Sequence, residues 1–240
     1  MTYIFDGTIN GFLTAFLQAF TAENARLIKD ETQLLLGEEP CYVTTNVEKA
    51  TKAKLRLCCF DRQCMHDLDF LLRSGETDAS QTAFLYFKLL ATTKTPVRNH
   101  FAEPSVFRAN TYIKKVSYEI HRMHGFLRFT ECASGALYAP FTPDNDICDL
   151  LLPHFRARLP QYPFVLHDVS RKKAAVYDGK NTFVAPLPAA NVLLSAKEES
   201  WKALWKRYYA AVNIPERERL EQMRGYLPVR YRSFMTEFEK

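Results

Sequence analysis

Apolar positions in the first part of the chain form one short run and then follow helical spacing. Residues 3–5 are apolar, Asp-Gly-Thr follows at residues 6–8, and the next apolar residues lie on one helix face: Phe12, Leu13, Phe16, Leu17 and Phe20. This pattern predicts a strand, a turn and a helix that Asp6 or Thr8 caps. Helix N-termini bind anions, but a single glycine in the turn is too weak a signal for a phosphate-binding loop.

The region from about residue 47 to residue 123 is predicted to be mainly helical, after a strand at residues 41–45. Its last helix is expected to run from about Pro104 to His124, with Gly125 well placed to end it. One face of this helix is apolar and consists of Val106, Ala109, Ile113, Val116, Ile120 and Met123.

Beyond Gly125 the pattern changes to short alternating segments that are separated by turn residues. Strands are predicted at residues 126–132, 136–141, 163–167, 174–177 and 182–185. Between the second and third strands, Asp144 or Asp146 is expected to cap a helix that continues to Leu159. Because hairpins dominate, we expect a largely antiparallel sheet with helices on one side, and hence an α+β fold.

Residues 186–197 contain two prolines and are predicted to be a linker. Helices are predicted after it, at residues 198–213, 216–223 and 228–238. The chain is therefore interpreted as a single unit at residues 1–240 with three sub-parts: a mainly helical part at 1–124, an α+β sheet at 125–187 and a basic helical C-terminus at 198–240.

The composition is that of an ordinary folded protein, with 47% hydrophobic and 25% charged residues. No apolar stretch approaches the length of about 18 residues that a spanning helix needs. The N-terminus carries Asp6 where a signal peptide would carry basic residues. The six cysteines are expected to be reduced thiols. These features predict a cytoplasmic protein that does not contact a membrane.

The net charge of +5 is unevenly distributed along the chain. Residues 1–100 carry 11 Lys and Arg against 12 Asp and Glu, a net charge of −1. Residues 101–240 carry 21 Lys and Arg against 15 Asp and Glu, a net charge of +6. Such an asymmetry favours a polyanionic partner, although a modest imbalance also occurs in proteins that bind none.

Positive charge is most concentrated near the C-terminus, where it is interleaved with aromatic residues. Between Lys202 and Arg232 lie eight Lys and Arg residues against three Glu residues. Arginine binds phosphate in a bidentate manner, and aromatic rings stack on unpaired bases. Apolar residues here recur at helical spacing, so we expect most of them to dock this helix onto the core: Trp201, Trp205, Tyr208 and Val212. The basic residues left to face a ligand are Lys206, Arg207, Arg217, Arg230 and Arg232.

The polar side of the predicted helix at residues 104–124 is a second candidate site. Three charged residues share one face at i, i+4 and i+7 spacing: Lys115, Glu119 and Arg122. His121 and His124 lie beside them. One interpretation is a catalytic or phosphate-binding cluster, and the other, which is favoured for any single residue, is a solvated face with ion pairs.

No metal site and no cofactor are predicted. Four potential ligands lie close together, but their spacing is not that of Cys-x-x-Cys sites, and buried thiols in a helical core are the better interpretation: Cys58, Cys59, Cys64 and His66. His121 has no second ligand at a recognisable spacing. The sequence contains no glycine-rich phosphate loop, no three-cysteine radical-enzyme motif and no Gly-x-Ser-x-Gly elbow.

Three segments together resemble one protein family. Residues 119–129 (EIHRMHGFLRF) are similar to its core motif E-x-H-R/K-x-x-x-F-x-R-F, and residues 205–238 are similar to its closing signature. Residues 5–13 (FDGTINGFL) are similar to its start. On these motifs the chain is identified as a member of the DNA metabolism or repair family, domain of unknown function 4130.

This resemblance implies a DNA-linked task and a radical SAM protein as partner. Members of the family accompany a radical SAM protein, and some are fused to a uracil-DNA-glycosylase-like domain. It supplies no established catalytic residue. The family usually shows Arg-x-Asn where this chain has Arg217-Glu218-Arg219, so no role tied to that asparagine carries over.

The leading hypothesis is a nucleic-acid-binding accessory protein in DNA metabolism or repair that works with a radical SAM partner. Its predicted contact residues are Arg122, Arg128, Lys206, Arg207, Arg217, Arg230, Tyr231 and Arg232. One alternative is an enzyme that acts on DNA or nucleotides, with Glu119 as general acid/base and His121 beside it. The other alternative is a protein-interaction module without nucleic-acid contact.

Overall fold

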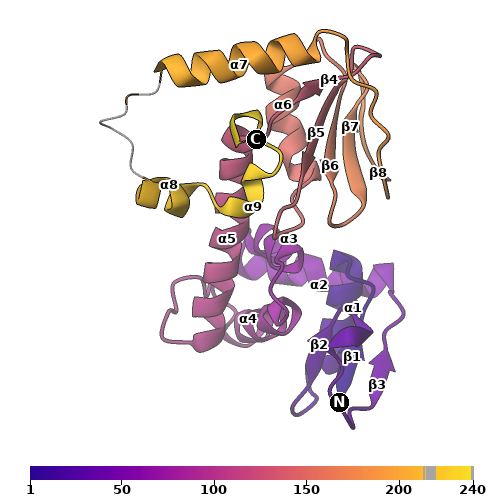
Figure 1. The fold of residues 1–240 in the computed structure, drawn as a ribbon. Helices are drawn as coiled ribbons and strands as arrows, with labels where there is room; N and C mark the ends of the chain where they lie inside the picture. Colours follow the sequence, from indigo (N-terminus) through magenta and orange to yellow (C-terminus); the bar gives the residue numbers. More distant parts are fainter. Residues whose placement is uncertain (213, 215–219, 239–240) are drawn as a thin grey trace. The chain divides into compact units, whose positions relative to one another are not determined.

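The computed structural model describes residues 1–212, 214 and 220–238 of the chain. The chain divides into two compact units, Met1–Tyr118 and Glu119–Lys240, and each unit combines helices with its own sheet (Figure 1). This confirms the predicted α+β class.

The first unit contains a three-stranded parallel sheet with the spatial order β2-β1-β3. The strands are β1 (Thr2–Ile4), β2 (Arg26–Ile28) and β3 (Pro40–Tyr42). The predicted strand, turn and helix at the N-terminus are confirmed, because Thr8 Oγ1 accepts a hydrogen bond of 2.9 Å from the Gly11 N–H and caps α1 (Ile9–Ala19). β2 was not predicted.

Helices make up most of the first unit, as predicted for the region from residue 47. After the short 3-10 helix η1 (Glu31–Gln33) and β3, they are α2 (Val47–Phe60), α3 (Cys64–Arg73), α4 (Ala79–Thr93) and the first part of α5 (Pro104–Phe126). Aromatic rings join α1 and α4 in the core, with 5.9 Å between the ring centroids of Phe12 and Phe87 and 6.0 Å between those of Phe16 and Phe84. Gln81 of α4 also hydrogen-bonds the backbone of β2 and the residue before it, through the Leu27 N–H (2.8 Å) and the Ala25 carbonyl (3.1 Å).

The cysteines around the α2–α3 connection match the predicted buried thiols only in part. Cys64 is buried and Cys58 is half-buried, but Cys59 is exposed because it lies on the outer side of the last turn of α2.

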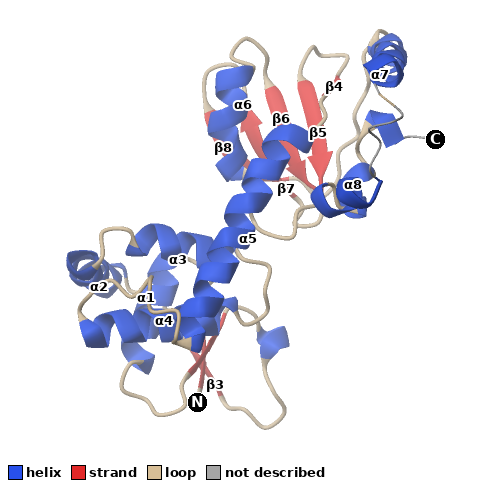
Figure 2. Ribbon diagram, turned by 90° about the vertical axis from the view of Figure 1, so that its left-hand side faces the viewer, coloured by secondary structure: helices blue, strands red, loops and turns tan. Residues whose placement is uncertain are grey.

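The second unit contains a five-stranded sheet with the order β4-β5-β6-β7-β8. Its strands are β4 (Thr130–Glu131), β5 (Leu137–Phe141), β6 (Phe164–Asp168), β7 (Lys173–Tyr177) and β8 (Thr182–Pro186). All neighbouring pairs are antiparallel except β5 and β6, so the largely antiparallel sheet is confirmed. After the 3-10 turn η2 (Asp149–Leu151), α6 (Leu152–Arg158) packs on one face of the sheet (Figure 2), where Phe155 contacts Phe164 at a ring distance of 6.4 Å.

Two predicted boundaries near the centre of the chain were wrong. α5 continues through Gly125 to Phe126, because the Leu127 N–H still bonds to the Met123 carbonyl at 3.2 Å. The strand predicted at residues 126–132 is therefore reduced to β4. Asp144 and Asp146 also do not begin a helix, because the helical segment starts later, after Cys148, and both aspartates belong to a loop.

The C-terminal segment forms α7 (Glu198–Val212), α8 (Leu220–Tyr226), α9 (Val229–Arg232) and the 3-10 turn η4 (Thr236–Phe238). The expectation that the apolar residues of α7 dock it onto the core was wrong. Trp201 and Tyr208 are each 56% exposed and Val212 is 53% exposed. Polar contacts hold this helix instead: Glu198 Oε2 accepts from the Glu131 N–H at 2.8 Å, and the Trp205 indole N–H donates to Glu237 at 3.1 Å. Within the described part of the chain, no helix is both long and apolar enough to cross a membrane.

Candidate functional site

Glu119 lies on the buried side of α5. Its side chain is only 3% exposed. On the same face of the helix, Glu119 lies between Val116 and Met123, which are both buried. Lys115, by contrast, is on the surface and pairs with Glu76 at 2.6 Å. The prediction that Glu119 shares a solvated face with Lys115 was therefore wrong, because the step of three residues from Val116 turns its carboxylate inward.

The Glu119 carboxylate accepts four hydrogen bonds. Oε1 accepts from the Asp144 N–H (2.9 Å) and the Tyr231 hydroxyl (2.5 Å), and Oε2 accepts from the Asn145 N–H (2.8 Å) and side-chain amide (2.6 Å). A carboxylate offers about four lone-pair positions, so all are in use. To act as a general acid or base, Glu119 would first have to break one of these bonds. The geometry instead gives it the task of joining three distant segments.

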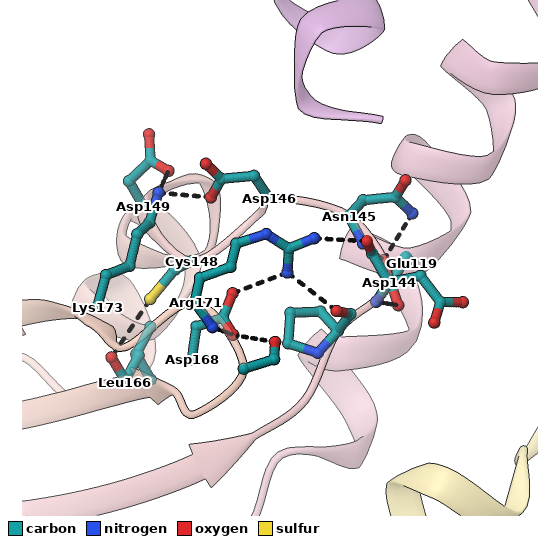
Figure 3. Close-up of polar contacts among 12 residues, drawn as sticks. Glu119, Asp144, Asn145, Asp146, Cys148, Asp149, Leu166, Asp168, Arg171 and Lys173 are labelled. Atoms are coloured by element: carbon teal, nitrogen blue, oxygen red, sulfur yellow. Dashed lines mark hydrogen bonds and ion pairs between the residues drawn. The ribbon is translucent and has the colours of Figure 1, made fainter. Parts of the chain in front are cut away.

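The loop that Glu119 holds is also held from its opposite side (Figure 3). Arg171 donates to the carbonyls of Pro143 (3.0 Å) and Asp144 (2.5 Å) and to the fully buried Asp168 (3.0 Å). Lys173 of β7 pairs with Asp146 farther along the loop. The loop's N–H groups therefore point to Glu119, while its carbonyls point to Arg171. This two-sided arrangement fixes the loop conformation.

The C-terminal signature contributes Arg230 and Tyr231 to the same network. Burial, together with the hydrogen bond to Glu119, raises the pKa of the Tyr231 hydroxyl, which is thereby kept as a donor. Arg230 forms an ion pair with Asp144, and its guanidinium lies 4.7 Å from the centroid of the Tyr231 ring. Burial acts to lower the pKa of Arg230, but the contacts with Tyr231 and Asp144 outweigh it, and the pKa is raised. Two predicted site residues are thus brought into the Glu119 network from 111 and 112 positions away.

Arg128 is engaged in a second, separate contact with the C-terminus. Its Nη2 donates to Glu237 Oε1 at 2.6 Å and its Nε to Oε2 at 3.3 Å, and its guanidinium lies 5.6 Å from the Trp205 ring. Burial acts to raise the pKa of the Glu237 carboxyl, but the Arg128 contact outweighs burial and lowers it. Arg128 therefore fixes the position of Trp205 and of the 3-10 turn η4, which contains Glu237.

A cavity of about 800 Å³ opens next to Arg128, and we call it the α7 groove. It lies entirely within the second unit, bordered by α7, the segment after α5 and the end of α6. Its basic and aromatic lining residues are Arg128, Phe129, Arg158, Tyr162, Lys197, Trp201, Lys202 and Trp205. Two acidic residues, Glu131 and Glu198, also line it.

The remaining predicted contact residues lie elsewhere. Lys206 and Arg207 are exposed on α7, and Arg122 is half-buried on α5, but none of the three lines the α7 groove. Arg232 donates to the Leu227 carbonyl at 3.0 Å and lies over the Phe238 ring, so it supports the C-terminal fold. Arg217 lies outside the described residues.

The histidines form no metal centre. His121 is exposed, whereas the ring of His124 stacks on His154 at 3.9 Å, and burial followed by the neighbouring His154 lowers the pKa of His124. Among the described residues, no group of three or more His, Cys, Asp or Glu side chains is placed to hold a metal ion.

Sequence reasoning missed most of the groove lining. Arg158, Tyr162 and Lys197 were not singled out, although the basic and aromatic stretch from Arg156 to Tyr162 was a signal that could have identified two of them. Asn145 and Arg171 were also missed, since nothing in the sequence connects them to Glu119.

The fold and this site define an α+β protein whose second unit combines a buried carboxylate network with a basic, aromatic groove. A family model described as a domain of unknown function, DUF4130, matches residues 77–237. This match covers more than half of the 240-residue chain, so the chain belongs to the DUF4130 family. This match confirms the domain of unknown function 4130 that the sequence motifs identified, and the link to DNA metabolism or repair stays a prediction. Neither a curated protein nor a solved structure matches the chain.

Proposed function

We propose that the second unit binds nucleic acid through the α7 groove, and that the protein is an accessory factor in DNA metabolism or repair. The observation that supports this is the lining of one cavity by four aromatic and four basic side chains, against two acidic ones. Glu198, one of those two, directs its carboxylate to the Glu131 N–H. Positive charge next to aromatic rings is the combination that nucleic-acid grooves use.

Arg158 and Lys197 are the groove cations best suited to bind phosphate. Both are exposed, and neither side chain has a hydrogen-bonding or ion-pair partner among the residues that the structure describes. Arg128, in contrast, already holds Glu237. A phosphate that meets Arg158 or Lys197 displaces only water and counterions, so binding there does not break a contact of the fold.

A salt series of binding to single-stranded and duplex DNA tests the proposal. Each phosphate contact makes the slope of log affinity against log salt more negative, by about 0.7 for a single strand and about 0.9 for a duplex. The double variant Arg158→Gln/Lys197→Gln should therefore flatten the slope by about 1.4 to 1.8 and weaken binding at every salt concentration.

The matched control is Lys114→Gln/Lys180→Gln, which removes the same charge from two exposed positions outside the groove. This control should leave the slope nearly unchanged. An absence of binding at low salt, or an equal loss of affinity in both double variants, would overturn the proposal.

A radical SAM protein is proposed as partner on the family resemblance, and α7 offers a surface for a protein contact. Leu204 and Tyr208 are 54% and 56% exposed on this helix. This observation favours a protein-interaction module as the second candidate function. Co-purification of a radical SAM protein that persists after nuclease treatment and in high salt would support a direct contact, and its loss on nuclease treatment would contradict one.

A further inference from the structure

We infer that the α7 groove takes unpaired nucleotides, with bases stacked on Trp201 and Tyr162, and that it discriminates against duplex. This inference rests on the proposed nucleic-acid function and specifies its substrate class. The shared chemistry is an unpaired base on a phosphodiester backbone, as found in single-stranded DNA and in single-stranded RNA.

Two aromatic rings of the α7 groove have faces that are open to solvent. Trp201 is 56% exposed and Tyr162 is 51% exposed, and both line the groove. Neither ring stacks on another ring or a cation within the described part of the chain. Large aromatic surfaces in contact with water carry a hydrophobic cost that a flat ligand removes.

Trp205 differs from Trp201, although it lies one helical turn away on the same groove. Its ring lies 5.6 Å from the Arg128 guanidinium and 5.8 Å from the Tyr208 ring, and its indole N–H bonds to Glu237. These contacts fix Trp205 as a wall of the groove. The Trp201 ring has no such contacts with the residues that the structure describes, so it is available to a ligand.

An open aromatic ring selects for a base whose own face is uncovered. Every nucleobase has a π-face, but in a duplex both faces of an interior base are covered by its neighbours. A free aromatic ring can therefore stack only on a base that is unpaired, at a strand end or turned out of the helix. Stacking of this kind raises affinity by about fivefold to 150-fold per base.

The two groove cations lie near the two open rings in the sequence, as contacts to the backbone of the same strand require. Lys197 precedes Trp201 by one helical turn, and Arg158 precedes Tyr162 by four residues, so one unpartnered cation accompanies each free ring. Together they provide two pairs of a base platform and a phosphate contact in one groove.

The chain contains two tryptophans, and both line this groove, so intrinsic fluorescence reports on it directly. In the Trp205→Phe variant, Trp201 is the single emitter. We expect its fluorescence to be quenched by an oligothymidylate and by an oligouridylate, and to be unchanged by a strand of abasic sites or by a relaxed, covalently closed circular duplex, which has neither strand ends nor a loop. If Trp205→Phe does not fold, the difference between wild type and Trp201→Phe gives the same information.

Affinity provides the second readout. Trp201→Ala should weaken binding of the single strand by about fivefold to 150-fold and should change duplex binding less than about twofold. Tyr118→Ala, which removes a 62% exposed ring outside the groove, is the control and should leave both affinities unchanged.

The possible results distinguish a failure of this inference from a failure of the proposed function. Equal affinity for duplex and single strand, without tryptophan quenching but with loss of binding in Arg158→Gln/Lys197→Gln, overturns the inference and leaves the proposed function intact. Binding to no nucleic acid overturns both. Quenching by only one of the two oligonucleotides supports the inference and identifies the strand as DNA or RNA.

Discussion

The second unit contains two polar assemblies that are built in opposite ways. Around Glu119, a carboxylate that is 3% exposed has a donor for each of its lone pairs. In the α7 groove, Arg158 and Lys197 have no partner among the described residues, and Trp201 offers an open ring face.

This difference separates the part of the site that maintains the fold from the part that is available to a ligand. A buried polar group that is fully hydrogen-bonded gains nothing from a ligand and loses much if a partner is removed. An exposed cation or ring without a partner gains contacts when a ligand binds, and the fold loses little stability when that side chain is removed. The two assemblies should therefore respond differently to substitution, the first in stability and the second in binding.

The largest effect is expected for Glu119→Ala. Removal of the carboxylate leaves the Asn145 amide, the Tyr231 hydroxyl and two backbone N–H groups without their acceptor, which should lower the free energy of unfolding by about 3–5 kcal/mol. Urea denaturation followed by circular dichroism measures this loss. Glu199→Ala, at an exposed position of α7, is the control and should stay within about 0.5 kcal/mol of wild type.

Glu119→Gln distinguishes this structural role from catalysis. The amide keeps the shape but presents an NH₂ group to donors, so stability should fall here as well. If Glu119→Gln proves as stable as wild type and loses an enzymatic activity, the structural interpretation is wrong.

A smaller effect is expected for Tyr231→Phe, which removes one donor to the Glu119 carboxylate. Hydrogen bonds to charged groups contribute about 1.5–3 kcal/mol, and a loss of that size should appear in urea unfolding at pH 7. Tyr226→Phe, at a 64% exposed position, should show no measurable change.

Tyr231 also predicts a dependence on alkaline pH. Its pKa is raised in the folded protein above the ordinary value of 10.0, so at high pH the unfolded chain loses the proton before the folded chain does. The contribution of Tyr231 to stability is therefore complete below pH 10 and is lost as pH rises through the raised folded pKa. The difference in stability between wild type and Tyr231→Phe should narrow above pH 10, and a constant difference would contradict this assignment.

The smallest effect on stability is expected for Trp201→Ala. Because more than half of this side chain is in solvent, the free energy of unfolding should change by no more than about 0.5 kcal/mol. A large loss of stability would show that Trp201 supports the fold, and the contrast between the two assemblies would then not hold.

The sequence predicted the elements of the fold better than the site. Periodicity located α5 and four of the five strands of the second sheet, because a helical or alternating pattern is local. The role of Glu119 could not be predicted in this way, since its partners lie about 25 and 112 residues away and only the folded chain brings them together.

The groove was missed for a related reason. Helical spacing identifies the residues that share a face but not whether that face meets the core or solvent. The same spacing of Trp201 and Tyr208 was therefore compatible with docking and with exposure.

The two hydrogen bonds of Gln81 bear on how the shared region of this family should be isolated. The match begins at residue 77, just before α4, and leaves β1, β2 and β3 outside. Gln81 nevertheless bonds to the backbone at Leu27 and Ala25, and Phe84 and Phe87 pack on rings of α1. In a protein fragment that comprises only residues 77–237, the rings of Phe84 and Phe87 would lose their partners on α1 and would be exposed to solvent. The stretch that the family model matches is thus shorter than the stretch that must be expressed to keep these rings in their core.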